Sequence, residues 1–306
     1  MIIINDVKNR VGKEWVATVG FFDGVHLGHR FLINELRHLA DEQHLPSAVF
    51  TFPVHPRIVL QADYQPKLLN SFEEKMELLE TTGVDFCAVL NFTLELANYS
   101  ASDFISLLAD KWRVRTLLIG HDHRFGHNRA EGFDEYVKYG SMHGMQIIQA
   151  SSYTKDTAIV SSSKIRLLLS QCKVKEAAEL LTYPYRLKGH VISGYQVGRK
   201  LGFPTANIKV DEPFKVWPGT GVYAVWVYIK GMRYKGMLSV GGRPTFDDEN
   251  LAVEVHLLHF SEYIYQEQIE VEFIEYLREN KKFDTVEALI AQLMNDKEVV
   301  ENILSL

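Results

Sequence analysis

The first half of the chain alternates short apolar runs with stretches whose apolar residues recur at helical spacing. The runs that predict strands are 16–19, 48–52, 86–92, 116–119 and 146–150. Helices are expected after the first strand, over 72–81 behind a capping box of Ser71 and Glu74, and over 102–112. Strands that alternate with helices need crossover connections and pair in parallel. This half is therefore predicted to be a doubly wound α/β domain.

The second half shows a different pattern. Its strand candidates, 223–229, 253–260 and 269–276, are rich in β-branched and aromatic residues, and the last alternates apolar and polar residues with period two. No helical stretch separates them, so a small antiparallel barrel or sandwich is expected, followed by a final helix from near Asp284 to about Leu304. A helical stretch over 165–181 comes before this half. We therefore expect domains at 1–182 and 183–306.

Composition supports two globular domains. The chain has 306 residues, 46% of them hydrophobic and 24% charged, and its net charge of −6 argues against a general nucleic-acid binder. Cys87 and Cys172 are too few for a disulfide framework or a four-thiolate zinc site, so a reducing, cytoplasmic setting is expected. There is no basic leader, and no apolar run approaches the ~20 residues that cross a bilayer, so a membrane partner is not expected.

A dense run of glycines and histidines lies where the first predicted strand meets the first helix. It reads Gly20-Phe21-Phe22-Asp23-Gly24-Val25-His26-Leu27-Gly28-His29. A helix N-terminus offers N–H groups and partial positive charge to an anion, and glycines let the backbone approach it closely. His26 and His29 are three apart and can share one face of the opening turn. The run predicts a phosphate site, and without a GxxxxGKS/T motif it does not indicate a P-loop kinase.

A second glycine-rich stretch, 189–207, opens the other half. It mixes glycine, basic and hydroxyl residues without helical or strand periodicity, which is typical of a functional loop. If the backbone is extended there, Thr205 and Asn207 face one side and could ligate the Mg²⁺ that ATP carries. Pro204 would fix the approach of the chain to that site.

Two other patterns do not predict a site. His123 and His127 have the i, i+4 spacing of a metal pair, but Gly120 and Gly126 bracket them and no third ligand is evident, which argues against zinc. A GxGxxA run from Gly219 leads into a strand rather than a helix, which argues against a dinucleotide site.

The histidine run resembles the HxGH motif of the nucleotidyltransferase superfamily. Its longer form, FDGVHLGH, resembles the adenylyltransferase half of the bacterial bifunctional riboflavin kinase/FAD synthetase family. Further similarities, in the family's order, are Thr51-Phe52 with His55-Pro56-Arg57, the loop 120–126 with Asp122 and Arg124, and the run Ser161-Ser162-Ser163-Lys164-Ile165-Arg166. The departures from the family pattern are Phe21 for asparagine, Val54 for proline, His123 for phenylalanine and Ser163 for threonine.

The second half is similar to the riboflavin kinase domain of the same family. The most distinctive motif of that domain, GRxLGFPTAN, matches 198–207. Further matches lie at 221–224, at 241 with 243–246, at 253–258, and at 277–279 with 282–283. Ser239 stands where asparagine is usual, and His259 replaces an aspartate. The resemblance covers nearly the whole chain and has independent motifs in both halves.

For the first half, the resemblance implies transfer of AMP from ATP to the phosphate of FMN, with release of pyrophosphate. That phosphate is already ionised, so the step needs alignment and charge neutralisation rather than a general base. The expected catalytic residues are His26, His29 and Arg166, the last as a clamp on the leaving phosphates. The other expected phosphate contacts are Gly20, Phe22, Asp23, Gly24, Gly28, Asp122, Arg124, Ser161, Ser162 and Ser163.

For the second half, the resemblance implies phosphorylation of riboflavin by Mg-ATP. The 5′-hydroxyl of riboflavin is neutral and needs a proton acceptor, and the family assigns that role to the glutamate that matches Glu254. On spacing alone, Glu254 could also be a solvated residue on an outward face. Thr205 and Asn207 are the expected Mg²⁺ ligands, and the rest of the expected nucleotide loop is Gly198, Arg199, Gly202 and Pro204.

The leading hypothesis is a bifunctional enzyme that uses ATP, riboflavin and FMN and makes FAD. A second hypothesis leaves only the kinase site active, because most of the departures from the family pattern lie in the first half. A third, a flavin-binding regulator without catalysis, is disfavoured because His26, His29, Asn207 and Glu254 are retained and a binder needs no proton acceptor. The oligomeric state is left open.

Overall fold

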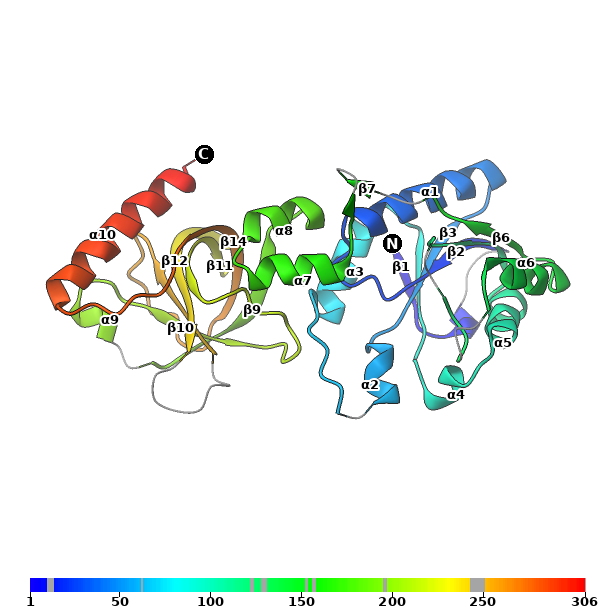
Figure 1. The fold of residues 1–306 in the computed structure, drawn as a ribbon, viewed down its shortest axis with the longest axis horizontal. Helices are drawn as coiled ribbons and strands as arrows, with labels where there is room; N and C mark the ends of the chain where they lie inside the picture. The colour runs from blue at the N-terminus through cyan, green and yellow to red at the C-terminus, as the bar shows by residue number, and fades with distance from the viewer. Residues whose placement is uncertain are drawn as a thin grey trace. The chain divides into compact units, whose positions relative to one another are not determined.

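The computed structural model describes residues 1–9, 14–61, 63–121, 124–127, 131–151, 154–155, 158–194, 197–242 and 251–305. They form two compact units, Met1–Ser162 and Ser163–Leu306 (Figure 1). The predicted boundary at 182/183 concerns the two functional halves and stays a prediction.

The first unit is built on a parallel six-stranded sheet with the order β1-β4-β3-β2-β5-β6. The strands are β1 (Ile2–Ile4), β2 (Trp15–Val19), β3 (Ser47–Thr51), β4 (Phe86–Val89), β5 (Val114–Ile119) and β6 (Gln146–Gln149). The doubly wound prediction is confirmed, and among the six strands of this sheet the edge strand β1 was not predicted. The chain runs outward from β2 in both directions along the sheet, so the carboxyl end of β2 is a topological switch point, where such folds bind ligands.

Helices follow the strands of the first unit. They are α1 (Leu27–Gln43), α2 (Pro56–Leu60), α3 (Phe72–Glu80), α4 (Leu94–Ala97), α5 (Ala101–Ser106) with the π-turn η2 (Leu107–Lys111), and α6 (Phe133–Met142). The unit also contains the short η1 (Val7–Asn9) and an antiparallel pair of short strands, β7 (Thr154–Lys155) and β8 (Ala158–Ile159). The predicted capping box is present: Ser71 Oγ accepts from the Glu74 N–H at 3.2 Å and Glu74 accepts from the Ser71 N–H at 3.0 Å. The helix predicted over 102–112 starts at Ala101 because Ser100 caps it.

The second unit is a closed antiparallel barrel with the order β10-β13-β12-β11-β14-β9. The strands are β9 (Tyr185–Ile192), β10 (Ala206–Val210), β11 (Gly221–Ile229), β12 (Met232–Gly242), β13 (Leu251–Leu257) and β14 (Gln268–Arg278). Apolar residues such as Val225, Leu238 and Val255 are fully buried and fill the interior. The predicted barrel is confirmed, although β9, β10 and β12 were not among the strands predicted from the sequence.

The predicted final helix is α10 (Val286–Ile303), which covers the barrel from outside and packs Val300 and Leu304 against strands β11 and β12. Its N-cap is Thr285, whose hydroxyl accepts from the Ala288 N–H at 3.2 Å, one residue later than the expected start at Asp284.

The helical stretch predicted over 165–181 is two helices, α7 (Ser162–Ser170) and α8 (Val174–Leu181). They are separated at Cys172, whose φ of 62° lies in the left-handed region and cannot continue a helix. Helix α8 buries Val174, Ala177 and Leu181 and packs on β14 and β9 of the barrel. A short helix, α9 (Val197–Lys200), lies in the loop between β9 and β10.

Candidate functional site

The loop from β2 to α1 makes a tight left-handed turn at the switch point of the first unit. Phe22, Gly24 and Val25 have φ values of 56°, 87° and 36°, an unusual conformation for the two non-glycine residues. Both are held in it by burial, since Phe22 and Val25 are 2% and 0% exposed. A Cβ on Gly20 would lie 2.9 Å from the Phe22 ring, so glycine is needed where that ring folds back. The turn places His26 at the N-cap of α1.

The structure brings the two histidines of this loop together. Their rings stack with centroids 3.7 Å apart and an interplanar angle of 16°. His26 Nδ1 accepts from the backbone N–H of His29 at 3.4 Å, so a neutral His26 carries its proton on Nε2. A Cβ on Gly28 would lie 3.3 Å from both the His26 ring and the Val160 carbonyl oxygen, so this glycine leaves room for the imidazole.

Both the burial of His29 and its neighbours disfavour a positive charge on it. Burial is the main cause that lowers the pKa of His29 well below its usual range, and the nearby His26 and Lys75 lower it further. Among the described residues its Nδ1 has no hydrogen-bond partner. A neutral His29 offers a ring N–H as a donor, beside the N–H groups of the helix N-terminus.

Asp23 serves the loop itself rather than an open face. It is 5% exposed, and its Oδ1 accepts from the N–H groups of Leu69 and Asn70 at 2.8 and 3.4 Å. Its carbonyl oxygen accepts from Ser162 Oγ at 2.8 Å. Asp23 and Ser162 therefore join three segments that are distant in sequence around the turn.

The other predicted contacts of the first half are distributed as follows. Ser161 comes directly before α7, and Ser163 and Arg166 lie on α7 within the second compact unit. Arg124 is exposed in the loop after β5. Asp122 and His123 lie outside the described residues, and over the described part of the chain no group of three side chains is arranged to hold a metal ion.

In the barrel, strand pairing brings together the predicted kinase residues. Glu254 on β13 lies opposite Asn207 on β10 and opposite Ser239 on β12, so the three side chains share one face. Thr205 Oγ1 donates to Glu254 Oε2 at 3.3 Å. The same face of β12 carries Met237, which packs against α10, so this is the outer face of the barrel and Glu254 points outward, half-buried.

Asn207, Glu254 and Ser239 form a row across the three strands, and close backbone packing holds Asn207 in this row. It is 6% exposed, and a Cβ on Gly194 would overlap its side-chain amide. The nucleotide loop beside it closes on itself, because the Phe203 N–H donates to the Gly198 carbonyl at 2.9 Å and Gly202 adopts a φ of 82°. Phe203 is buried against the apolar cluster under α10.

His256 supports the same loop from β13. Its Nδ1 donates to the Pro204 carbonyl at 2.8 Å, and its ring meets the Phe203 ring edge-on with centroids 5.2 Å apart. Burial is the main cause that lowers the pKa of His256, so the ring is a neutral donor that holds Pro204 and hence Thr205 in place.

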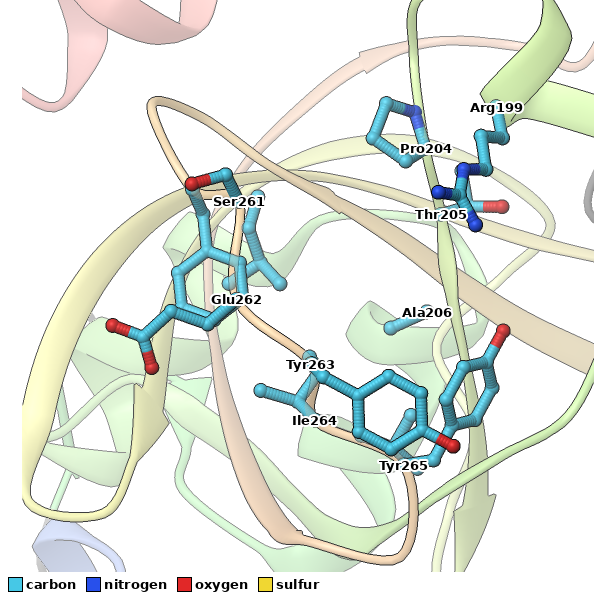
Figure 2. Close-up of a pocket in the computed structure, with 12 residues that line it drawn as sticks. Arg199, Pro204, Thr205, Ala206, Ser261, Glu262, Tyr263, Ile264 and Tyr265 are labelled. Carbon is cyan, nitrogen blue, oxygen red and sulfur yellow. The ribbon is translucent and has the colours of Figure 1, made fainter.

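A cavity of about 480 Å³ adjoins Thr205. Figure 2 shows Arg199, Pro204 and Thr205 on one side of this pocket and the rings of Tyr263 and Tyr265 on another, 4.9 Å apart between centroids. The volume suits a nucleotide-sized ligand. The two tyrosines were not predicted from the sequence, although the aromatic run between two strand candidates, with Tyr263 77% exposed, is a signal that could have pointed to them.

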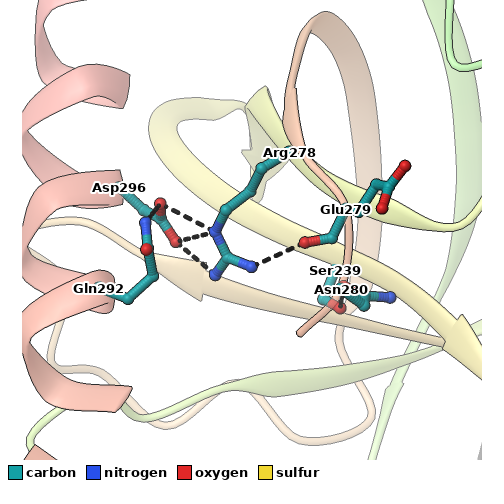
Figure 3. A network of polar contacts seen from close by, with 6 residues as sticks. All are labelled: Ser239, Arg278, Glu279, Asn280, Gln292 and Asp296. Carbon is teal, nitrogen blue, oxygen red and sulfur yellow. Dashed lines mark hydrogen bonds and ion pairs between the residues drawn. The ribbon is translucent and has the colours of Figure 1, made fainter. Parts of the chain in front are cut away.

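A polar network ties the row to the terminal helix (Figure 3). Ser239 Oγ donates to Asn280 Oδ1 at 3.3 Å, and Asn280 Nδ2 donates to the Val240 carbonyl at 2.8 Å. Two residues earlier, Arg278 donates Nη2 to Asp296 Oδ2 at 2.6 Å and Nε to both carboxylate oxygens. Asp296 is 3% exposed, so this is a buried ion pair between β14 and α10. The matched stretch 243–246 lies outside the described residues.

A parallel sheet with an HxGH loop at its switch point, together with a barrel that sets a carboxylate beside a nucleotide-sized pocket, defines a nucleotide-using transferase with two sites. Residues 8–164 match the FAD synthetase family, and residues 181–304 match the riboflavin kinase family. The chain belongs to the bifunctional riboflavin kinase/FMN adenylyltransferase family.

Relatives of that description match over almost the full chain. The protein of Listeria monocytogenes is 37% identical over 93% of this chain and 92% of its own. The Haemophilus influenzae protein is 37% identical over 96% and 95%, and the Escherichia coli K12 protein 33% identical over 96% and 94%.

A crystal structure from Streptococcus pneumoniae is similar in fold. It is 31% identical to this chain, with a TM-score of 0.87 over 98% of both chains, and is described as a macrolide-efflux protein. In the described part of the present chain, no helix has the length and apolar character that crossing a membrane requires.

Proposed function

We propose that the two reactions of the family are divided between the two sites, with FMN adenylylation at His26 and His29 and riboflavin phosphorylation at Glu254. As a member of this family the chain makes FMN from riboflavin and FAD from FMN. In this proposal the adenylyltransferase half spans 1–182 and the kinase half 183–306. The family matches at 8–164 and 181–304 support that division.

The observation that carries the kinase assignment is the contact of 3.3 Å between Thr205 Oγ1 and Glu254 Oε2, with Asn207 directly opposite Glu254. Glu254 takes the proton of the riboflavin 5′-hydroxyl as that oxygen attacks the γ-phosphorus of ATP. The bond from the γ-phosphorus to the bridging oxygen breaks, and ADP leaves. Glu254 lies half-buried on the outer face of the barrel, where both substrates could reach its carboxylate.

The donor set also suits magnesium. Thr205 and Asn207 offer two neutral oxygens beside a carboxylate, and Mg²⁺ typically takes few protein oxygens and completes its shell with phosphates and water. Bound there, the ion would neutralise charge on the β- and γ-phosphates. The tyrosine-lined pocket next to Thr205 would take the adenosine of ATP, with the rings of Tyr263 and Tyr265 against the base and Arg199 near the phosphates.

In the adenylyltransferase site, a phosphate oxygen of FMN attacks the α-phosphorus of ATP and pyrophosphate leaves. No proton acceptor is needed, because the nucleophile is already an anion. The α-phosphate would be held by the N–H groups at the start of α1 and by the imidazoles of His26 and His29. Arg166 would clamp the leaving phosphates, with further contacts from Gly20, Phe22, Gly24, Gly28, Asp122, Arg124, Ser161 and Ser163. The buried Asp23 and Ser162 would shape the loop.

One experiment tests both assignments. The purified chain is given riboflavin or FMN with ATP and Mg²⁺, and the flavin products are separated. We expect Glu254→Gln to lower riboflavin phosphorylation by about 10²- to 10⁴-fold while added FMN is still converted to FAD. We expect His29→Asn to convert riboflavin to FMN but not to convert FMN to FAD. If Glu254→Gln phosphorylates riboflavin normally, the kinase assignment is wrong, and if His29→Asn still makes FAD, the adenylyltransferase assignment is wrong.

The wild-type products decide between the sequence-based alternatives. FMN and FAD together support two working sites, FMN alone supports a kinase, and neither supports a flavin-binding regulator. A cytoplasmic setting is part of the proposal, supported by two cysteines that form no disulfide.

A further inference from the structure

Lys75 is a buried lysine under the histidine loop of the first unit. It lies on α3, is 3% exposed, and belongs to none of the motifs that point to phosphate chemistry. A charged amine in such a place is costly unless its hydrogen bonds and charge are satisfied. The groups around Lys75 therefore indicate what it does.

The ammonium of Lys75 joins the ends of two neighbouring strands. Its Nζ donates to the Phe52 carbonyl at 2.8 Å and to the Phe21 carbonyl at 3.2 Å. Phe21 follows β2 and Phe52 follows β3, so one side chain ties the two loops that leave the switch-point edge of the sheet. Nζ also lies 4.1 Å from the centroid of the Phe21 ring, within cation–π range. Phe21 in turn packs edge-on against His55, with centroids 4.8 Å apart.

The same loop is held a second time by an opposite charge. Asp23 binds the N–H groups of Leu69 and Asn70, just before α3, while Lys75 on α3 binds the carbonyl before Phe22. The loop and the start of α3 are thus joined by two reciprocal contacts, one from an acid of the loop and one from a base of the helix. The pair fixes the backbone that leads into the left-handed turn and His26.

We propose that Lys75 is a positioning residue of the adenylyltransferase reaction, whose ammonium holds the β2–α1 loop so that His26 and His29 meet the phosphates. This inference rests on the function proposed for that loop. Lys75 touches no reacting atom in the proposal and acts through the backbone of Phe21.

The electrostatics make the proposal testable by pH. Burial lowers the pKa of Lys75 to about 8, although the nearby Asp23 and Cys87 act in the opposite direction. Among the described residues, His29 also faces it from the loop side, and Glu74 on its own helix is engaged by the Ser71 N–H. Burial raises the pKa of Cys87 to about 12, so this thiol stays neutral across the working range. Above pH 8, Lys75 loses its charge and one of its three N–H donors.

The test compares Lys75→Met and Lys75→Arg with Lys138→Met, a matched change of an exposed lysine on α6. For each full-length protein, kcat/KM for ATP in FMN adenylylation is measured from pH 6.5 to 9.5, and riboflavin phosphorylation by the same sample is the internal reference. We expect Lys75→Met to lose about 10- to 100-fold in adenylylation with kinase activity within about twofold. The wild type should decline through pH 8, and Lys75→Arg, which stays charged, should not.

Several outcomes overturn the proposal. The proposal is wrong if Lys75→Met keeps adenylylation within about twofold of the wild type. It is also wrong if Lys75→Met loses both activities in parallel, which indicates a general structural role. An alkaline decline that persists unchanged in Lys75→Arg assigns it to another group. If Lys75→Met does not fold, the pH profiles of adenylylation by the wild type and by Lys75→Arg still test the proposal. Should His29→Asn keep FAD synthesis, the proposed site itself fails; should it lose synthesis while Lys75→Met does not, only the present inference fails.

Discussion

The two sites that we propose would hold a polyphosphate with different parts of the chain. In the first unit the proposed contacts come from a loop and a helix N-terminus at the switch point of a sheet, where burial disfavours a positive charge on His29. In the barrel they come from side chains on adjacent strands, with an acid among them. The difference follows the nucleophile: an ionised phosphate needs only alignment, whereas a hydroxyl needs a base.

The two sites also differ in what supports them. The loop of the first unit is fixed by buried charges below it, Asp23 and Lys75. The outward-facing row of the barrel depends on a cover, since α10 lies along the same face and is anchored by Arg278 and Asp296. Changes in either support should therefore affect one reaction and spare the other.

The largest expected effect is on the support of the barrel. Arg278→Ala leaves Asp296 buried without its cation, which typically costs about 3–5 kcal/mol of unfolding free energy. Denaturant unfolding followed by kinase activity should show this loss, with FAD formation from added FMN persisting to higher denaturant. The control is Lys297→Ala on the same helix, which removes an exposed ion pair of 4.0 Å and should change little. A loss below about 1 kcal/mol in Arg278→Ala would show that α10 is held by apolar packing alone.

A smaller effect is expected where the backbone approaches the kinase row. Gly194→Ala puts a methyl group into the Asn207 amide, which must move out of line with Glu254. We expect riboflavin phosphorylation to fall by about 100-fold, as misplacement of this kind does, with adenylylation unchanged. Steady-state rates of both reactions measure this, and Ser193→Ala, an exposed neighbour, is the control. Equal losses in both reactions would contradict a local effect.

The reciprocal change in the first unit should be milder. Gly28→Ala brings a methyl group to 3.3 Å from the His26 ring and the Val160 carbonyl, which is crowded but short of overlap. An overpacking cost near 1.4 kcal/mol corresponds to about a tenfold loss in FMN adenylylation, with the kinase unaffected. Asn34→Ala, on the exposed side of α1, serves as control. An unchanged adenylylation rate would mean that the His26 ring can shift without consequence.

The smallest effect concerns acid stability. The folded-state pKa of His29 is depressed, so as pH falls through 6.5 the unfolded chain takes up a proton on this residue and the folded chain does not. Stability present above pH 6.5 is therefore lost below it, by up to about 1.4 kcal/mol per pH unit until the folded pKa is reached. Thermal unfolding from pH 7.5 to 5 should show a shallower decline for His29→Asn than for the wild type or for His38→Asn on the same helix. Parallel declines would assign the acid lability to other groups.

Sequence reasoning reached most of the fold because its signals are local. Every predicted strand is present, and the capping box at Ser71 begins a helix as expected. The failures are local features too. The break at Cys172 arises from one left-handed residue within an apolar helical pattern, which periodicity does not register.

The sites divide in the same way. The loop motif at His26 could be predicted because a strand, a turn and a helix are contiguous in sequence. Glu254, Thr205 and Asn207 could be named but not assembled, because their contact depends on the register of β10 with β13. Lys75 gave no signal, since a lysine inside a helix of mixed charge looks exposed until its partners are known.

Helix α8 has a consequence for anyone who wishes to express the halves separately. Its apolar side covers β9 and β14, and Gly219 at the entry to β11 also packs against the end of α7, its N–H donating to the Leu169 carbonyl at 2.9 Å. A fragment that starts near residue 181, where the riboflavin kinase match begins, would lack this helix. The apolar surface of β9 and β14 would then be exposed to solvent and would promote aggregation. A fragment that starts at Ser163 would keep α8 over these strands and should remain soluble.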